Sequence, residues 1–163
     1  MNVLRASTIA LGVSVFLWGI LVGGIVYSHL VFMPVFLGDL PESSAVVQGR
    51  YGLNEAVFWT SLHPLLIVSL IATLVLNWKN NARRKLILIP AVAYLIALVI
   101  TAVYFVPELI AFADSLNSNV AKSEWLARGW RWERLSWVRG TILGLAFVPL
   151  IYALTKSPDV RKP

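Results

Sequence analysis

The sequence predicts an all-α integral membrane protein that folds as a single four-helix bundle over residues 1–163. Of its residues, 58% are hydrophobic and only 13% are charged, whereas a soluble domain carries about 25% charged residues. Four apolar stretches have almost no charge in their middles, and about 20 such residues cross a hydrocarbon layer of about 30 Å. Nearly every ionisable residue at membrane depth falls at the same end of these stretches. The expected spans are residues 7–36, 56–78, 86–113 and 135–154.

The first span begins soon after Arg5 and stays apolar through Trp18 and Phe36. A secretory signal has an apolar core of about 7 to 15 residues, followed by a small-residue cleavage site. This apolar run is about twice as long as such a core. We therefore expect a retained span rather than a cleaved signal.

The second and third spans are joined by a short basic link, residues 79–85, which carries four cations and no acid. Because positively charged links stay in the cytoplasm, we expect a protein of the plasma (inner) membrane with both termini cytoplasmic. Residues 38–54 and 114–131 would then lie outside. Cations before and within the start of the fourth span oppose this rule, so we expect some of them inside the fold: Lys122, Arg128, Arg131, Arg134 and Arg139.

Glycines four residues apart predict how the first and fourth spans pack. Gly19 and Gly23, like Gly140 and Gly144, have the spacing of small residues that lets two helix backbones approach closely. We therefore expect these two spans to be neighbours. The same glycines could serve a contact between chains, which leaves a homo-oligomer open.

Each span contributes one ionisable or metal-capable side chain to a common outer layer. At a rise of about 1.5 Å per residue, these side chains lie at similar depths near the outer ends of their spans. An ionisable group inside a membrane is costly and usually faces the bundle interior with a partner. We therefore expect four side chains to line a single cavity: His29, His63, Glu108 and Arg139.

Two prolines adjoin this layer. Pro64 follows His63, and Pro107 precedes Glu108. Proline removes a backbone donor and leaves the carbonyl four residues earlier without its helical partner. We expect kinks at both prolines that widen the cavity.

The chemistry of the layer has three interpretations. His29, His63 and Glu108 could hold an iron, copper or zinc ion with an open position, and the two histidines could equally bind a haem. Alternatively, Glu108 pairs with Arg139 or Arg134 and the histidines donate to carbonyls freed by the kinks, which makes the layer structural. A metal-free binding site is the third interpretation.

Aromatic and polar side chains around the layer are candidates for binding a flat apolar molecule. Tryptophans cluster between Trp125 and Trp137, and an interfacial aromatic belt explains most of them. The other aromatic and polar candidates lie near the outer layer. The expected substrate-binding residues are Asn54, Trp59, Tyr104 and Trp132.

Several known arrangements of functional residues are missing from the sequence. There is no cysteine, which excludes disulfides, thiolate metal sites and cysteine nucleophiles. The motifs of phosphate-binding loops, zinc proteases and serine hydrolases are also missing. The basic residues that give the net charge of +6 lie at the ends of the spans, where anionic lipid headgroups attract them. The expected partners are therefore the lipid bilayer and an apolar small molecule, not nucleic acid.

Short motifs between about residue 23 and residue 147 carry a family resemblance. They are Met33-Pro34, Leu40-Pro41, Gln48, Asn54, the run Tyr-Phe-Val-Pro at 104–107 and the run Arg-Trp-Glu-Arg-Leu-Ser-Trp-Val-Arg at 131–139. Together these motifs resemble the anthrone oxygenase-like family of small four-span membrane proteins. That family closes with a Trp-x-x-x-Asn-x-x-Arg stretch. Here Ser136 stands in place of the asparagine, and Glu108 stands where the family often has a small or amide residue.

The resemblance implies an activity. The family includes enzymes that oxidise anthrones to anthraquinones with dioxygen, without an obvious soluble cofactor domain. The positions that match the family here are Asn54, Trp132 and Arg139.

We therefore expect a membrane-embedded oxidoreductase, or oxygenase, that acts on an apolar aromatic or quinone-like compound in the outer half of the bundle. His29, His63 and Glu108 would bind a metal or shuttle protons, with His63 or Glu108 as the base. Arg134 and Arg139 would stabilise an oxyanion, because a fixed cation in a dry site stabilises developing negative charge. The rival hypothesis is a non-enzymatic protein that binds a small molecule or lipid, or a subunit of a membrane complex.

Overall fold

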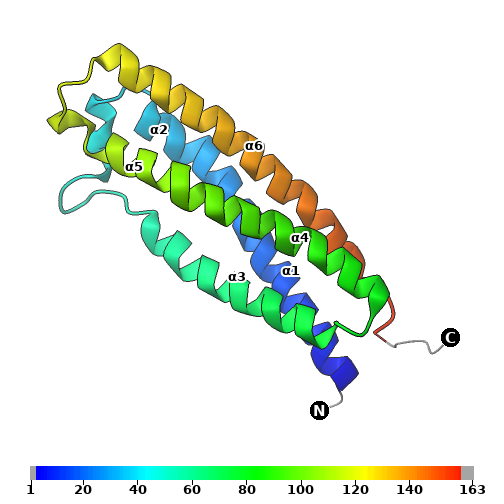
Figure 1. Cartoon of the computed structure of the whole chain (residues 1–163). Coiled ribbons are helices and arrows are strands. Elements are labelled where there is room, and N and C mark those ends of the chain that lie inside the picture. Colours follow the sequence, from blue (N-terminus) through cyan, green and yellow to red (C-terminus); the bar gives the residue numbers. More distant parts are fainter. Residues whose placement is uncertain (1–2, 159–163) are drawn as a thin grey trace.

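The computed structural model describes residues 3–158, which form an elongated bundle of four helical rods without a strand in that range (Figure 1). This confirms the predicted fold class. Two rods contain a π-helix, η1 or η3, in which the backbone hydrogen bonds span five residues. In chain order the elements are α1 (Val3–Tyr27), η1 (Ser28–Phe32), α2 (Met33–Leu37), η2 (Glu42–Val47), α3 (Ala56–Leu76), α4 (Asn81–Ile100), η3 (Thr101–Phe105), α5 (Val106–Ala113), η4 (Ser115–Asn117) and α6 (Lys122–Leu154).

All four rods are long and apolar enough to cross a membrane, which makes the chain an integral membrane protein. The fourth rod begins at Lys122 rather than near residue 135, because the stretch rich in tryptophan and arginine continues the helix. The third begins at Asn81, where the Asn80 side chain caps the helix by accepting a hydrogen bond from the Arg83 backbone N–H at 3.1 Å.

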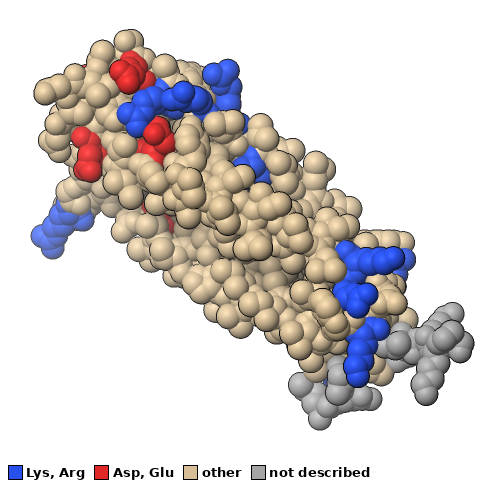
Figure 2. Space-filling view, viewed as in Figure 1, with Lys and Arg blue, Asp and Glu red and all other residues tan. Residues whose placement is uncertain are grey.

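The two ends of the bundle differ in charge. The N- and C-terminal parts lie together with the turn between α3 and α4, and we call this the termini end (Figure 1). The opposite end, formed by residues 38–55 and 114–121, is the loop end. On the face shown in Figure 2, the acidic residues gather toward the loop end, whereas the charged residues visible at the termini end are lysines and arginines.

Helix α1 organises the packing, since it contacts both α3 and α6, while α4 packs mainly against α6. The predicted contact between the first and fourth spans is thus confirmed. One hydrogen bond fixes it: the indole N–H of Trp18 donates to the backbone carbonyl of Leu143 at 3.1 Å, and Trp18 is fully buried.

Only half of the predicted glycines lie in this contact. A Cβ placed on Gly140 would meet Ile25 Cγ2 at 2.8 Å, and one on Gly19 would touch α6 at an ordinary distance. Gly23 and Gly144 border open space, with no heavy atom within 4 Å of such a Cβ. The close approach therefore depends on Gly140.

Both π-helices lie just before a proline. The backbone N–H of Met33 donates to the Ser28 carbonyl, and that of Val106 donates to the Thr101 carbonyl. Pro34 and Pro107 follow directly and have no N–H to donate. A π-turn is one of the local adjustments by which a membrane helix satisfies the backbone groups that proline frees.

A kink was expected at Pro64 as well, but no π-turn precedes this proline. Helix α3 continues through Pro64 as an α-helix. The π-turn that matches the one before Pro107 lies in the first rod, before Pro34. The first and third rods therefore share this feature, whereas the second does not.

We predict that Gly140→Leu destabilises the fold and that Gly144→Leu does not. The first leucine would clash with Ile25, and overpacking of this kind costs about 1–3 kcal/mol. The second would enter open space. Thermal unfolding in detergent measures both, and equal Tm values for the two variants would contradict a close approach at Gly140.

Candidate functional site

A chain of buried and partly buried hydrogen bonds joins three rods in the loop-end half of the bundle. His29 Nδ1 lies 3.0 Å from Glu133 Oε1, and His29 Nε2 lies 3.1 Å from Ser136 Oγ. The Arg139 guanidinium donates to Ser136 Oγ at 2.9 Å and to Thr101 Oγ1 at 2.7 Å. We call these five residues the His29–Arg139 network.

Local structure places each member of the network. Glu133, Ser136 and Arg139 follow one another at intervals of three residues in α6, so they share one face of that helix. His29 is the second residue of the π-helix η1, and Thr101 is the first residue of the π-helix η3. Both wide turns thus deliver a polar side chain to the same face of α6.

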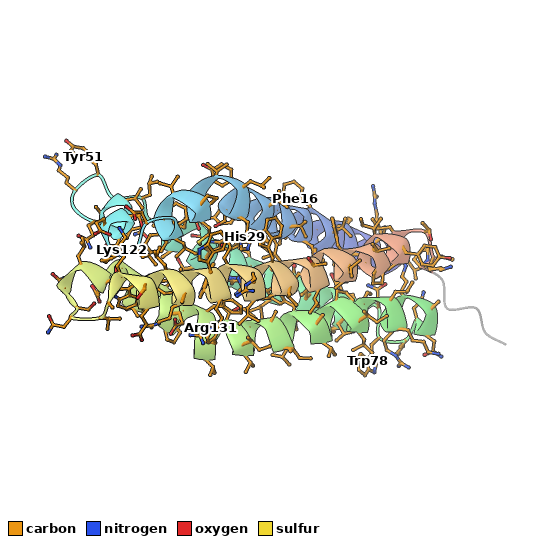
Figure 3. All side chains as sticks on the ribbon, turned by 90° about the horizontal axis from the view of Figure 1, so that it is seen from above. Phe16, His29, Tyr51, Trp78, Lys122 and Arg131 are labelled. Atoms are coloured by element: carbon orange, nitrogen blue, oxygen red, sulfur yellow. The ribbon has the colours of Figure 1, made fainter. Side chains whose placement is uncertain are left out.

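Aromatic rings enclose the network. The His29 ring stacks on Trp137, with centroids 4.6 Å apart, and the Arg139 guanidinium carbon lies 4.0 Å from the centre of the Phe105 ring. The Trp132 indole N–H donates to the Phe105 carbonyl at 3.1 Å. His29 is only 5% exposed and Ser136 is fully buried. Figure 3 shows His29 between the rods, whereas Phe16 lies on the outside.

Two buried polar atoms near this chain have no hydrogen-bond partner among the described residues. They are Glu133 Oε2 and the hydroxyl of Tyr104. Glu133 belongs to the network, and Tyr104 lies in η3 beside Phe105. A buried polar group without a partner costs about 1–3 kcal/mol, so these two atoms are unsatisfied hydrogen-bonding groups beside the network.

The predicted metal ligands do not come together. His63 Nδ1 is hydrogen-bonded to the Tyr94 hydroxyl at 2.5 Å, and Glu108 pairs with Arg128, while His29 belongs to the network. In the described part of the chain, no group of three or more His, Asp or Glu side chains is arranged to hold a metal ion. Both ring nitrogens of His29 already have hydrogen-bond partners, Glu133 and Ser136, within the network.

Glu108 helps to close the loop end of the bundle. Arg128 Nε and Nη2 donate to its two carboxylate oxygens at 3.1 and 2.9 Å, which is the bidentate geometry of a strong ion pair. The same guanidinium lies over the Trp125 ring at 4.3 Å. The partner of Glu108 is thus Arg128, not Arg139 or Arg134 as the structural interpretation of the layer expected.

The other predicted residues are distributed around the network. Trp132 and Tyr104 adjoin it through Phe105, and Arg139 lies within it. His63 stays outside and is hydrogen-bonded to the Tyr94 hydroxyl. Arg134 is exposed, and its side chain donates only to the Trp130 carbonyl of its own helix.

Asn54 and Trp59 lie apart from the network. They border two open grooves beside α1 and α3. Trp59 also stacks on His63, with ring centroids 5.8 Å apart.

Sequence reasoning missed Glu133, Ser136 and Thr101 as members of the site. Glu133 precedes the expected fourth span, residues 135–154, whereas the helix already begins at Lys122. The spacing of Glu133, Ser136 and Arg139 at three-residue intervals was the available signal, since it puts all three on one helix face.

A second polar cluster at the termini end was also missed. Arg83 is 1% exposed and has no acidic partner among the described residues. Its guanidinium donates to the Lys156 carbonyl from Nε at 3.0 Å and from Nη2 at 2.8 Å. Nη1 donates to the side chains of Thr8 and Asn77. The sequence pattern of the basic link, residues 79–85, does not separate Arg83 from its neighbours.

Comparisons of the chain with protein-family models, with curated proteins and with solved structures find no match. The function is therefore argued from the geometry of the site.

We predict that Ser136→Ala destabilises the protein by about 1–3 kcal/mol, because it removes the partner of His29 Nε2 and of one Arg139 N–H in a buried site. Ser61→Ala is the matched control, since Ser61 is exposed and donates only to a carbonyl of its own helix. Unfolding in detergent measures both. A Ser136→Ala variant as stable as the control would mean that the network contributes no stability.

Proposed function

We propose that this chain is a membrane-embedded oxidoreductase that oxidises an apolar aromatic or quinone-like compound at the His29–Arg139 network. The observation that carries the proposal is the continuous series of contacts from Glu133 through His29 and Ser136 to Arg139, in which His29 and Ser136 are buried. It combines a base with its orienting carboxylate and places a fixed cation beside them. These are the groups that an enolisable or phenolic compound needs to lose a proton.

His29 takes the role of the base in this proposal. The Glu133 carboxylate accepts the hydrogen bond from Nδ1–H, which leaves Nε2 as the basic nitrogen, as in other acid–histidine pairs. His63 and Glu108, the bases expected from the sequence, are each engaged in a separate pair. Arg139 stabilises the oxyanion of the deprotonated compound from a position that aromatic rings screen from water.

The oxidation then balances with dioxygen as the oxidant. His29 removes a proton from an activated CH₂ group, and the resulting carbanion forms a C–O bond to dioxygen. The peroxide anion takes the proton back from His29, and loss of water leaves a C=O group. One CH₂ group and one O₂ thus give one carbonyl group and one H₂O, with no other reductant or oxidant.

The resemblance to the anthrone oxygenase-like family supports this reaction class, and we propose membership of that family. Two of the three matching positions lie at the network: Arg139 is part of it, and Trp132 packs beside His29. Asn54 lies on a groove at the loop end instead.

Acyl transfer is a second candidate, because Glu133, His29 and Ser136 have the order and contacts of an acid–histidine–serine triad. Ser136→Asn separates the two candidates, since asparagine is the residue of the family at this position. Oxidation would survive this change, whereas hydrolysis of a lipophilic ester such as p-nitrophenyl butyrate would require the serine hydroxyl.

We predict that purified protein in lipid nanodiscs consumes O₂ and converts anthrone to anthraquinone. His29→Gln should lower the initial rate by about 10²-fold or more, the contribution of a positioned general base. Arg139→Gln should lower it by about 10²-fold through the loss of oxyanion stabilisation. An oxygen electrode and the absorbance of the product measure the rates.

Arg131→Gln is the control for Arg139→Gln, because Arg131 is an exposed arginine of the same helix. It should keep the parental rate. Equal rates for Arg131→Gln, Arg139→Gln and His29→Gln, in variants with the parental Tm, would reject the network as the site of oxidation.

We also propose that the termini end faces the cytoplasm and that the membrane is the inner (plasma) membrane. The basic residues of the turn between α3 and α4 support this orientation. Since the chain has no cysteine, single cysteines at Lys79 and Asn117 can be labelled selectively. In intact cells an impermeant maleimide should reach only the cysteine at 117. Labelling of the one at 79 without permeabilisation would reverse the orientation.

A further inference from the structure

An apolar groove runs along the surface between α1 and α3 in the loop-end half of the bundle, away from the network. Its volume is about 430 Å³, and Glu55 is the single acidic residue among those that line it. A second groove of about 310 Å³ continues toward the loop end and shares Tyr27 and Glu55 with the first. Glu55 thus lies where the two grooves meet.

The floor of the first groove is flat because it contains two consecutive glycines. A Cβ on Gly24 would meet the Phe58 ring at 2.7 Å, so only glycine fits there without a shift of that ring. Gly23 faces open space, with no atom within 4 Å of a Cβ placed on it. A side chain at position 23 would therefore fill the groove without disturbing the packing around it.

The walls of the groove are aromatic. Tyr27 lines it from α1, while Phe58 and Trp59 line it from α3. The Phe58 and Trp59 rings contact each other edge to face, with centroids 4.7 Å apart. A flat floor between aromatic walls fits a rigid ring system better than a flexible acyl chain, because flat rings can make the stacked or edge-on contacts that aromatic side chains favour.

Glu55 supplies the polar contact. Its Oε2 accepts hydrogen bonds from Ser28 Oγ at 2.8 Å and from the Trp59 indole N–H at 3.3 Å. These two bonds hold the carboxylate at the start of α3. No donor of the described residues bonds to Oε1, and Glu55 is half-buried. An acceptor without a partner beside an apolar surface favours a ligand that brings a donor.

We propose that this groove binds a flat, lipid-soluble, polycyclic compound that carries a hydroxyl group. The rings lie on Gly23 and Gly24 between the aromatic walls, and the hydroxyl donates to Glu55 Oε1. This binding stands apart from the oxidation proposed above, because no residue of the network lines the groove. The groove can therefore be tested by binding alone, whatever reaction the network performs.

The test uses 1-hydroxypyrene and pyrene, which differ only in the hydroxyl group. Protein in nanodiscs of zwitterionic phosphatidylcholine is titrated with each, and energy transfer from tryptophan to the pyrene ring reports binding. The parent should bind one 1-hydroxypyrene per chain and bind it about tenfold or more tightly than pyrene, as expected for a hydrogen bond to a charged group. Glu55→Leu should remove that difference.

The glycines provide matched variants. Gly23→Leu should weaken the binding of both probes about tenfold or more, because the side chain occupies the groove. Gly144→Leu, the other glycine that borders open space, should bind as the parent does. If Gly23→Leu fails to fold, Gly23→Ala should still weaken both probes, since even one methyl group lies on the floor.

Three results would overturn the proposal. The first is that neither probe binds saturably to the parent, and the second is that folded Gly23→Leu or Gly23→Ala binds as the parent does. The third is equal affinity of the parent for pyrene and 1-hydroxypyrene, which would mean that the groove takes apolar rings or acyl chains without using Glu55.

Discussion

Lipid offers no hydrogen bonds, and the guanidinium of Arg139 at membrane depth must find all of its partners inside the chain. Among the described residues it donates to Thr101 and Ser136, while the face of Phe105 covers the guanidinium carbon. These contacts oblige α6, η3 and η1 to meet in one register. The arrangement of the loop-end half of the bundle follows from these contacts, because a shift of η3 would separate Thr101 from Arg139 and a shift of η1 would separate His29 from Ser136.

The π-turns allow the three elements to meet in this register. A π-turn holds one more residue than an α-turn, so it rotates the side chains that follow relative to those that precede it. Here the two π-turns lie in the first and third rods, each ending just before an X-Pro pair. Each supplies a polar residue to α6, His29 from one and Thr101 from the other. The same local distortion thus satisfies backbone groups that proline frees and brings a polar side chain of the site to α6.

The number and order of the spans could be predicted from the sequence, and they agree with the four long apolar helices. The common level of the four site residues and the rotation about the helix axes could not. Glu108 pairs with Arg128, which lies 11 residues before Arg139 in α6, a rise of about 16 Å. Residue counts do not show that His63 turns toward Tyr94, nor that a π-turn re-aims His29 toward α6.

The start of α6 explains the error at Glu108. Apolar content alone placed the fourth span near residue 135, but the helix begins at Lys122. Arg128 is therefore helical and lies beside Glu108, so the carboxylate that seemed available for chemistry belongs to an ion pair that joins α5 to α6. Amphipathic helical turns before a span carry little hydropathy signal, although they place charges that the buried residues need.

The Arg83 cluster bears on how such a chain is made. Its guanidinium is satisfied largely by the carbonyl of Lys156, which lies 73 residues further along. A ribosome delivers the third rod long before that carbonyl exists, and of the partners seen in the folded structure the side chains of Thr8 and Asn77 come earlier in the chain. Biogenesis of the bundle is completed only when its last helix arrives.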